Sequence, residues 1–221
     1  MMKPICKLTH QAGLSLLELS ISLAIASAVA VLLLRQQSEE LRQVRLKTES
    51  QWVVGVLADI QQNKGSSANF ASLSDYTLGT IRSVPAAYLK VDVTGTTVTN
   101  GFGGNVHVAP LSLGGGTSNA YALSYSSVPR DTCAKLVVSL HEFAKSDAPL
   151  YGIIGDTGVT SAVPTTIGMN ADGTLFVSGS GQKVLKASSN AGLDMSAVGE
   201  FCDSANGSSN LLRSLTLIRW P

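Results

Sequence analysis

The sequence predicts an α+β protein, with one long N-terminal helix followed by a globular head of short strands and a further helix. An uninterrupted apolar segment covers residues 14–34, and the polar, proline-free segment 35–64 continues the helical pattern. From residue 65 onward, short β-like runs alternate with glycine-rich turns. With 14% charged residues, 5% aromatic residues and 21 glycines, the composition is typical of an exported surface protein rather than a cytosolic enzyme.

The apolar segment 14–34 has the length of a membrane span. As a helix it would be roughly 30 Å long, about one hydrocarbon core. Alanines and serines recur along it, and such small side chains let helices approach closely. Its only ionisable residue is Glu18, near its beginning. A carboxylate in an apolar span costs about 2.5–3.5 kcal/mol at the bilayer centre and less toward an end, so Glu18 indicates a partner.

A cut after Gly13 would supply that partner. Leu14 would then carry a free α-amine one helical turn away from Glu18. In a packed bundle, the amine of one subunit could meet Glu18 of its neighbour. This pairing would set the axial register between the subunits.

Two plainer interpretations of the N-terminus stay open. An ordinary signal peptide would use Lys3 and Lys7 as its basic region and be cut after Ala28 or Ala30. Glu18 inside the apolar region argues against it, and so does the apolar run that continues past both sites. An uncleaved signal anchor would explain the span but not the glutamate.

The second part of the long helix is amphipathic. Val53, Val56, Leu57 and Ile60 recur at i, i+3, i+4 and i+7, so they form one apolar stripe that is expected to pack on the head. The charged residues are expected to be solvated or to face neighbouring subunits. They are Arg35, Glu39, Glu40, Arg42, Arg45, Lys47 and Glu49.

The head, residues 65–221, is expected to contain strands and one helix. Residues 130–143 predict an amphipathic helix that carries Cys133, and Asp172-Gly173 is typical of a hairpin turn. The last strand has an apolar density that favours a central place in its sheet. The expected strands are residues 88–93, 105–108, 121–125, 150–154, 174–177, 183–187 and 211–220.

The chain has three cysteines, an odd number for an exported protein. If Cys6 lies in a removed leader, Cys133 and Cys202 remain and can pair. Closing so long a loop would stabilise the fold by roughly 4 kcal/mol in the chain-entropy model, and it would require an oxidising compartment. Two unpaired buried thiols are the alternative.

Nothing in the sequence calls for an enzyme, a metal or another cofactor. Cys133 with a histidine could form a nucleophile–base pair, but pairing in a disulfide would remove the thiol. The histidines and cysteines do not have zinc-site spacing. The formal net charge is +1 and there is no polybasic stripe, so nucleic-acid binding is not expected.

The segment GLSLLELSISLAIASAVAVLLL resembles the prepilin signature of type IV pilins and pseudopilins. In that family a membrane peptidase cuts after the glycine and methylates the new N-terminal amine. The resemblance implies a leader of residues 1–13, cleavage after Gly13, N-methylated Leu14 and an assembly role for Glu18. Leucine at position 14 and the 13-residue leader are similar to the type IVb branch.

The head resembles type IVb pilins too, of the PilS-like and toxin-coregulated-pilin-like kind. GFGGNVHV is similar to the glycine-rich start of their sheet, and YALSYSSVPRDTCAKLV to a strand followed by a cysteine-bearing helix. The resemblance implies an αβ-roll, in which the long helix packs on an antiparallel sheet. It also implies that a bridge between Cys133 and Cys202 closes the C-terminal region, whose surface loops would carry the specificity.

The implied protein is a structural subunit of a type IVb pilus. Residues 14–34 would form the transmembrane and polymerisation half of the first helix, and residues 35–64 its amphipathic half. Its partners would be other copies of itself, the prepilin peptidase, the inner-membrane assembly machinery and the membrane itself before assembly. It would wait in the bacterial inner membrane with its head in the periplasm and then enter an extracellular filament for adhesion, aggregation or conjugation.

Two alternatives remain at this point. A minor pilin or a type II secretion pseudopilin would have the same N-terminus but would be present in few copies. A membrane-anchored periplasmic enzyme or binding domain would form no filament and would keep an uncleaved N-terminus or one cut by signal peptidase.

Overall fold

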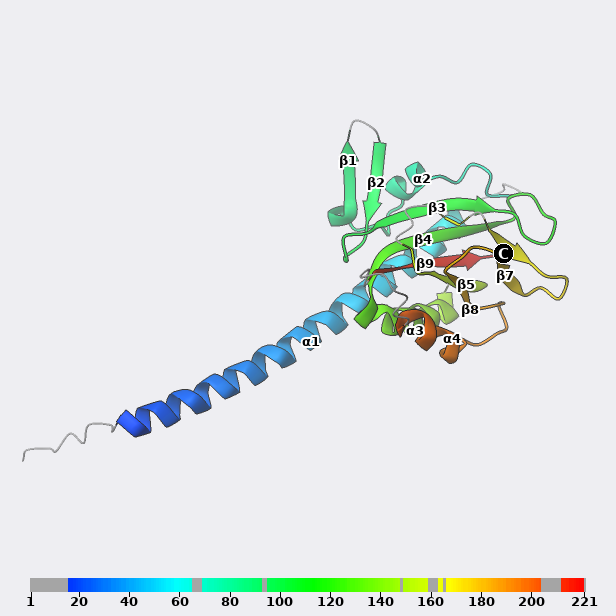
Figure 1. Cartoon of the computed structure of the whole chain (residues 1–221). Helices are drawn as coiled ribbons and strands as arrows, with labels where there is room; N and C mark the ends of the chain where they lie inside the picture. The colour runs from blue at the N-terminus through cyan, green and yellow to red at the C-terminus, as the bar shows by residue number, and fades with distance from the viewer. Residues whose placement is uncertain are drawn as a thin grey trace, which may run out of the picture. The chain divides into compact units, whose positions relative to one another are not determined.

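Figure 1 shows a computed structural model of the chain, which describes residues 16–64, 69–92, 95–147, 149–158, 163–164, 166–203 and 212–220. The chain divides into two compact units, Met1–Val44 and Arg45–Pro221. Each is described by itself below. The first contains the beginning of helix α1 (Leu16–Asn63), and the second, called the head here, contains the end of that helix and all other elements.

The head follows the predicted alternation of short elements. Its helices after α1 are α2 (Asp75–Thr80), a 3-10 turn (Ala86–Tyr88), α3 (Arg130–Asp147) and α4 (Met195–Asp203). Its strands are β1 (Leu89–Asp92), β2 (Gly95–Thr99), β3 (Asn105–Leu111), β4 (Ala120–Pro129), β5 (Gly152–Asp156), β6 (Ile167–Met169), β7 (Leu175–Val177), β8 (Gln182–Lys186) and β9 (Leu212–Arg219).

Seven of the described strands form one antiparallel sheet in the order β1-β2-β3-β4-β9-β5-β8, and β6 and β7 form a separate hairpin. The last strand, β9, lies between β4 and β5, which confirms its predicted central position (Figure 1). Because β9 has a strand on each side and a covered face on each side, Arg213–Ile218 are all buried, and Leu215, Leu217 and Ile218 are fully enclosed. The predicted α+β class with an antiparallel sheet is confirmed.

One face of the sheet packs against α1 and α3. The predicted stripe of α1 is buried there: Val53, Val56 and Leu57 are fully enclosed, with the apolar residues of β4 and β9 in the same core. The hydroxyl of Tyr121 on β4 donates to the carbonyl oxygen of Leu57 at 2.6 Å. This bond ties the helix to the sheet in addition to the apolar contact.

The opposite face of the sheet carries a smaller apolar cluster. Side chains alternate along a strand, so Ala122 of β4 and Ile218 of β9 point away from α1. The β6–β7 hairpin covers them with Ile167 and Leu175. This hairpin turns at the predicted Asp172-Gly173, where Gly173 has a φ of +82°, a backbone conformation that favours glycine.

Helices α2 and α4 do not appear among the elements predicted from the sequence. The sequence of α2, DYTLGT, has a low helix propensity and is a single turn and a half, so its contacts with the sheet stabilise it. The nine residues of α4 are too few for their periodicity to distinguish a helix from a strand. Helix α3 was predicted and extends four residues further, to Asp147.

Candidate assembly helix and disulfide-closed region

The first part of α1 has apolar side chains on all sides. Between Leu16 and Leu34 every residue is exposed, and the leucines there are 54–87% exposed. Among the described residues, α1 is the one helix that is long and apolar enough to cross a membrane. A helix that is apolar all round is stable only where lipid or other helices cover it.

The polar groups of this segment suit an apolar environment. The hydroxyls of Ser20, Ser22 and Ser27 donate to carbonyl oxygens three or four residues earlier, at 2.7–2.9 Å. Their hydrogen-bonding groups are therefore satisfied within the helix, which lowers the cost of removing them from water. Other helices can then approach these small residues closely.

Glu18 lies in the first turn of α1, with an exposed side chain. Gly13 and Leu14 lie outside the described residues, so the expected pair between the Leu14 amine and Glu18 stays a prediction.

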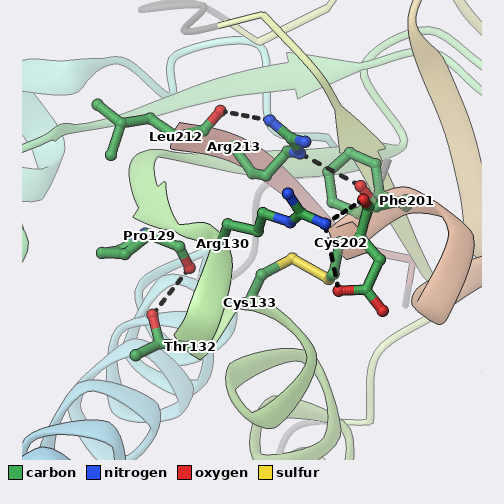
Figure 2. The surroundings of a disulfide bond; sticks show 9 residues. Pro129, Arg130, Thr132, Cys133, Phe201, Cys202, Leu212 and Arg213 are labelled. Atoms are coloured by element: carbon green, nitrogen blue, oxygen red, sulfur yellow. Dashed lines mark hydrogen bonds and ion pairs between the residues drawn. A yellow bond between two sulfur atoms is a disulfide. The ribbon is translucent and has the colours of Figure 1, made fainter. Parts of the chain in front are cut away.

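The predicted disulfide is present between Cys133 and Cys202 (Figure 2). Its sulfur atoms are 2.02 Å apart and join α3 to α4, with a Cα–Cα distance of 5.7 Å. Both cysteines are buried, at 0% and 2% exposure. The bridge therefore closes the region between residues 133 and 202, which precedes β9 in the chain, as the resemblance implied.

Two arginines hold the end of α4 beside this disulfide (Figure 2). Arg130, at the start of α3, donates from Nη2 to the carbonyl oxygen of Asp203. Arg213 on β9 donates from Nε to the carbonyl oxygen of Phe201 at 3.2 Å. Cations at a helix C-terminus satisfy its last carbonyls and its partial negative charge, so these contacts hold α4 in place together with the covalent bridge.

Glu49 corrects one sequence-based expectation. It was expected to be solvated or to face a neighbouring subunit, but it is fully buried. Its Oε1 accepts from the Tyr88 hydroxyl at 2.5 Å and the Gly101 amide at 2.9 Å. Its Oε2 accepts from the Trp52 indole at 2.8 Å and from the Tyr125 hydroxyl. These four donors replace the water that a buried carboxylate loses.

The sequence does carry a signal for this burial. The buried stripe of α1 begins earlier than predicted, at Leu46, and Glu49 lies between it and Val53 at the spacing of three and four residues. A carboxylate on that spacing faces the core unless the helix ends first. Burial and the bond to Glu49 also raise the pKa of Tyr88 to about 12.

A second polar contact holds α2 on the sheet. Strand β3 leaves β2 after Val106, so the amide of Val108 lacks a partner strand on that side. Asp75 supplies the acceptor: Oδ1 accepts from that amide at 2.8 Å, and Oδ2 lies 2.6 Å from His107 Nδ1. Burial alone would raise the pKa of Asp75, but these hydrogen bonds and the charge of His107 together lower it.

Across residues 16–64 and the described parts of the head, the His, Cys, Asp and Glu side chains form no group of three or more that could hold a metal ion. Cys133 is in the disulfide, so its thiol is not a free nucleophile.

No curated protein sequence matches the chain. A type IVb pilin from Salmonella typhi is 17% identical with a TM-score of 0.46, over 79% of this chain and 97% of its own. TcpA, a type IV pilin from the El Tor biotype of Vibrio cholerae, is 14% identical with a TM-score of 0.49, over 79% and 98%.

The family comparison covers most of the head. The family described as PilS N terminal matches residues 43–168, more than half of the chain, from the amphipathic end of α1 to β6. The match begins after residues 14–34, so it does not bear on Gly13, Leu14 or Glu18. Because the match spans more than half of the chain, this protein belongs to the PilS family.

Proposed function

We propose that this pilin is the structural subunit of a type IVb pilus, matured by a prepilin peptidase and polymerised through its N-terminal helix. Residues 1–13 are the leader, and cleavage after Gly13 leaves Leu14 as the N-methylated first residue. Residues 14–34 are the transmembrane and polymerisation half of the first helix, residues 35–64 its amphipathic half, and residues 65–221 the head.

The observation that carries the proposal is the exposed apolar beginning of α1, with Glu18 in its first turn and a folded, disulfide-containing head as a separate unit. Lipid covers that segment before assembly, and the same segments of neighbouring subunits cover it afterwards. Because lipid is as apolar as leucine, packing and polar pairs, rather than the hydrophobic effect, decide the register between helices.

The proposed location follows from the same chemistry. The subunit waits in the bacterial inner membrane with its head in the periplasm, where the disulfide forms, and the assembly machinery then transfers it into an extracellular filament. The filament serves adhesion, aggregation or conjugation. A minor pilin or a secretion pseudopilin is the alternative.

The test is the intact mass and N-terminal sequence of the protein sheared from the cell surface. We expect a chain that starts at Leu14, carries one methyl group and is two hydrogens lighter than the dithiol form. A chain that starts at Met1, or after Ala28 or Ala30, would contradict the proposal. The amount of this chain relative to other sheared subunits distinguishes a major from a minor pilin.

A further inference from the structure

An open hollow of about 670 Å³ lies on the head, on the sheet face opposite α1. Three segments that are distant in the sequence line it: the turn between β3 and β4, the β6–β7 hairpin, and Trp220 directly after β9. The hairpin belongs to the region that the disulfide closes. The volume is in the range of pockets that hold a small ligand.

Two aromatic side chains, Phe176 and Trp220, line the hollow together with Met169 and Ala171. Phe176 is 43% exposed, and its ring lies across the backbone of Gly168, where a Cβ would be only 2.3 Å from Cζ. Trp220 contacts Tyr151 with ring centroids 5.2 Å apart and approaches Gly114, where a Cβ would be 3.4 Å from Cη2. Glycine at position 168 therefore lets the Phe176 ring lie against bare backbone.

Tyr151 holds this arrangement in place. Its hydroxyl donates to the carbonyl oxygen of Gly173 in the β6–β7 turn, while its ring packs against Trp220. One side chain thus braces both the turn and the indole. The hollow is therefore formed before any ligand arrives, which reduces the entropic cost of binding.

The polar groups of the hollow are neutral. Asn170 donates from Nδ2 to the hydroxyl of Thr174 at 2.9 Å, and the described residues offer no partner to its Oδ1. The same part of the chain offers no acceptor to the indole N–H of Trp220. None of the described residues that line the hollow carries a charge.

We propose that this hollow binds a neutral saccharide. A pyranose ring has an apolar C–H face, which fits against the rings of Trp220 and Phe176, and a rim of hydroxyls, which can bond Asn170, the indole N–H and the peptide groups of the glycines. An anionic ligand would lose its hydration without gaining an ion pair here, because no cation lines the hollow and the carboxylate of Asp172 lies in the same hairpin turn. This inference goes beyond filament assembly and does not depend on it.

The test uses the full chain in a zwitterionic detergent without a sugar head group, because a glycoside detergent would compete. The probes are the methyl glycosides of galactose, glucose and mannose, with N-acetylneuraminic acid as the charged comparison. Saturation-transfer NMR and tryptophan fluorescence report binding. Trp52 is buried, so a fluorescence change on saturation reports Trp220.

We expect at least one neutral glycoside to bind saturably, with affinity reduced roughly tenfold or more by Trp220→Ala and by Phe176→Ala. Phe176 is the more exposed of the two, so its variant keeps the test valid if the Trp220 variant fails to fold. Tyr76→Ala is the matched control, because Tyr76 is 72% exposed and lies outside the hollow. Its affinity should equal that of the wild type.

Any of the following results would overturn the proposal. The first is no saturable binding of any neutral glycoside up to roughly 100 mM, well above the millimolar range of weak complexes. The second is unchanged binding in both aromatic variants, or preferential binding of the charged sugar. The third is a concentration-dependent dimer of the head that Trp220→Ala abolishes in sedimentation, which would assign the hollow to a second copy of the chain.

Discussion

The indole N–H of Trp52 donates a hydrogen bond to the carboxylate of Glu49, 2.8 Å away and one turn earlier in the same helix. The same carboxylate accepts from Tyr88 beside β1, from Gly101 in the β2–β3 turn and from Tyr125 on β4. One buried side chain of α1 therefore fixes three separate segments of the head. The amphipathic half of α1 is positioned by this charge as well as by its apolar stripe.

Replacing this carboxylate should destabilise the head. Glu49→Gln keeps the shape but places an amide NH₂ against donors that need an acceptor, so at least one buried donor loses its partner. Loss of a hydrogen bond to a charged group costs roughly 1.5–3 kcal/mol, and we expect a loss at the upper end. Urea unfolding of the full chain in detergent, followed by Trp52 fluorescence, measures it.

Glu40→Gln is the matched control for this variant. Glu40 is in the same helix but exposed, so its substitution should change the free energy of unfolding by less than about 0.5 kcal/mol. Equal stability of the Glu49 and Glu40 variants would show that the four hydrogen bonds contribute little.

Tyr88 makes the same cluster sensitive to alkali. Burial and the bond to Glu49 raise its pKa from 10.0 to about 12, so the folded state binds this proton more tightly than the unfolded state does. The stability that this difference provides is complete below pH 10 and is lost as the pH rises toward 12. We expect Tyr88→Phe to reduce the decline of the urea midpoint over that interval. An unchanged decline would contradict the role of Tyr88.

The sequence predicted the elements whose patterns are long or chemically distinctive. The stripe from Val53 to Ile60, the amphipathic α3 and the apolar β9 each follow from periodicity, and the disulfide follows from the count of cysteines outside the expected leader. These signals are local, because burial of one face determines the residues at fixed spacing.

The features that were missed depend on contacts between distant residues. The spacing of Glu49 on α1 indicates its burial, but no local pattern indicates the donors that make this burial possible, which lie 39, 52 and 76 residues away. In the same way, the hydrogen bond between the Asp75 carboxylate and the Val108 amide holds α2 on the sheet. That amide is available only because β3 stops pairing with β2 after Val106. Trp220 and Phe176 line the same hollow because of the topology of the sheet and not because of their spacing in the sequence.

The contact between Asp75 and β3 should weaken in acid. Hydrogen bonds from His107 and Val108 outweigh burial and lower the pKa of Asp75 below 3.8, so the folded state favours the carboxylate. This contribution is complete above pH 3.8 and is lost as the pH falls through the lower, folded pKa. We expect Asp75→Asn to be less stable than the wild type at about pH 6 and to show a smaller decline toward about pH 2.

A second variant separates the two bonds to Asp75. His107→Gln removes the ring but leaves the bond from the Val108 amide, so it should raise the pKa of Asp75 only in part. Carboxyl ¹³C titration measures this shift directly. If the pKa of Asp75 were the same with and without His107, the pairing of the two side chains would be wrong.

The disulfide should contribute strongly to the stability of the head. It joins residues 69 positions apart, for which the chain-entropy model gives roughly 4 kcal/mol. We expect the double variant Cys133→Ala, Cys202→Ala to lose much of this, measured by the urea midpoint under non-reducing conditions. Cys6→Ser is the control, because cleavage at the proposed site after Gly13 would remove Cys6 from the mature chain. A double variant as stable as this control would contradict the expectation.

The last prediction concerns Glu18, whose proposed partner is the amine of a neighbouring subunit. Glu18→Ala should still insert and fold, because the residue lies in the unit before Arg45 and removing a charge favours insertion. Filament yield should fall severely, because the helices lose the pair that sets their register. The measurement compares the amount of subunit in sheared filaments with the amount that stays in the membrane. An intact disulfide in the membrane fraction confirms that the variant has folded.

Glu39→Ala is the matched control, since Glu39 is an exposed glutamate further along the same helix. The filament yield of this variant should match that of the wild type, because Glu39 has no proposed role in setting the register between subunits. Glu18→Asp tests whether the length of the side chain matters. Aspartate keeps the negative charge, but its side chain is one methylene shorter, so the carboxylate lies further from the amine. We therefore expect an intermediate filament yield. Normal filaments from Glu18→Ala would show that apolar packing alone sets the register and that the carboxylate has another purpose.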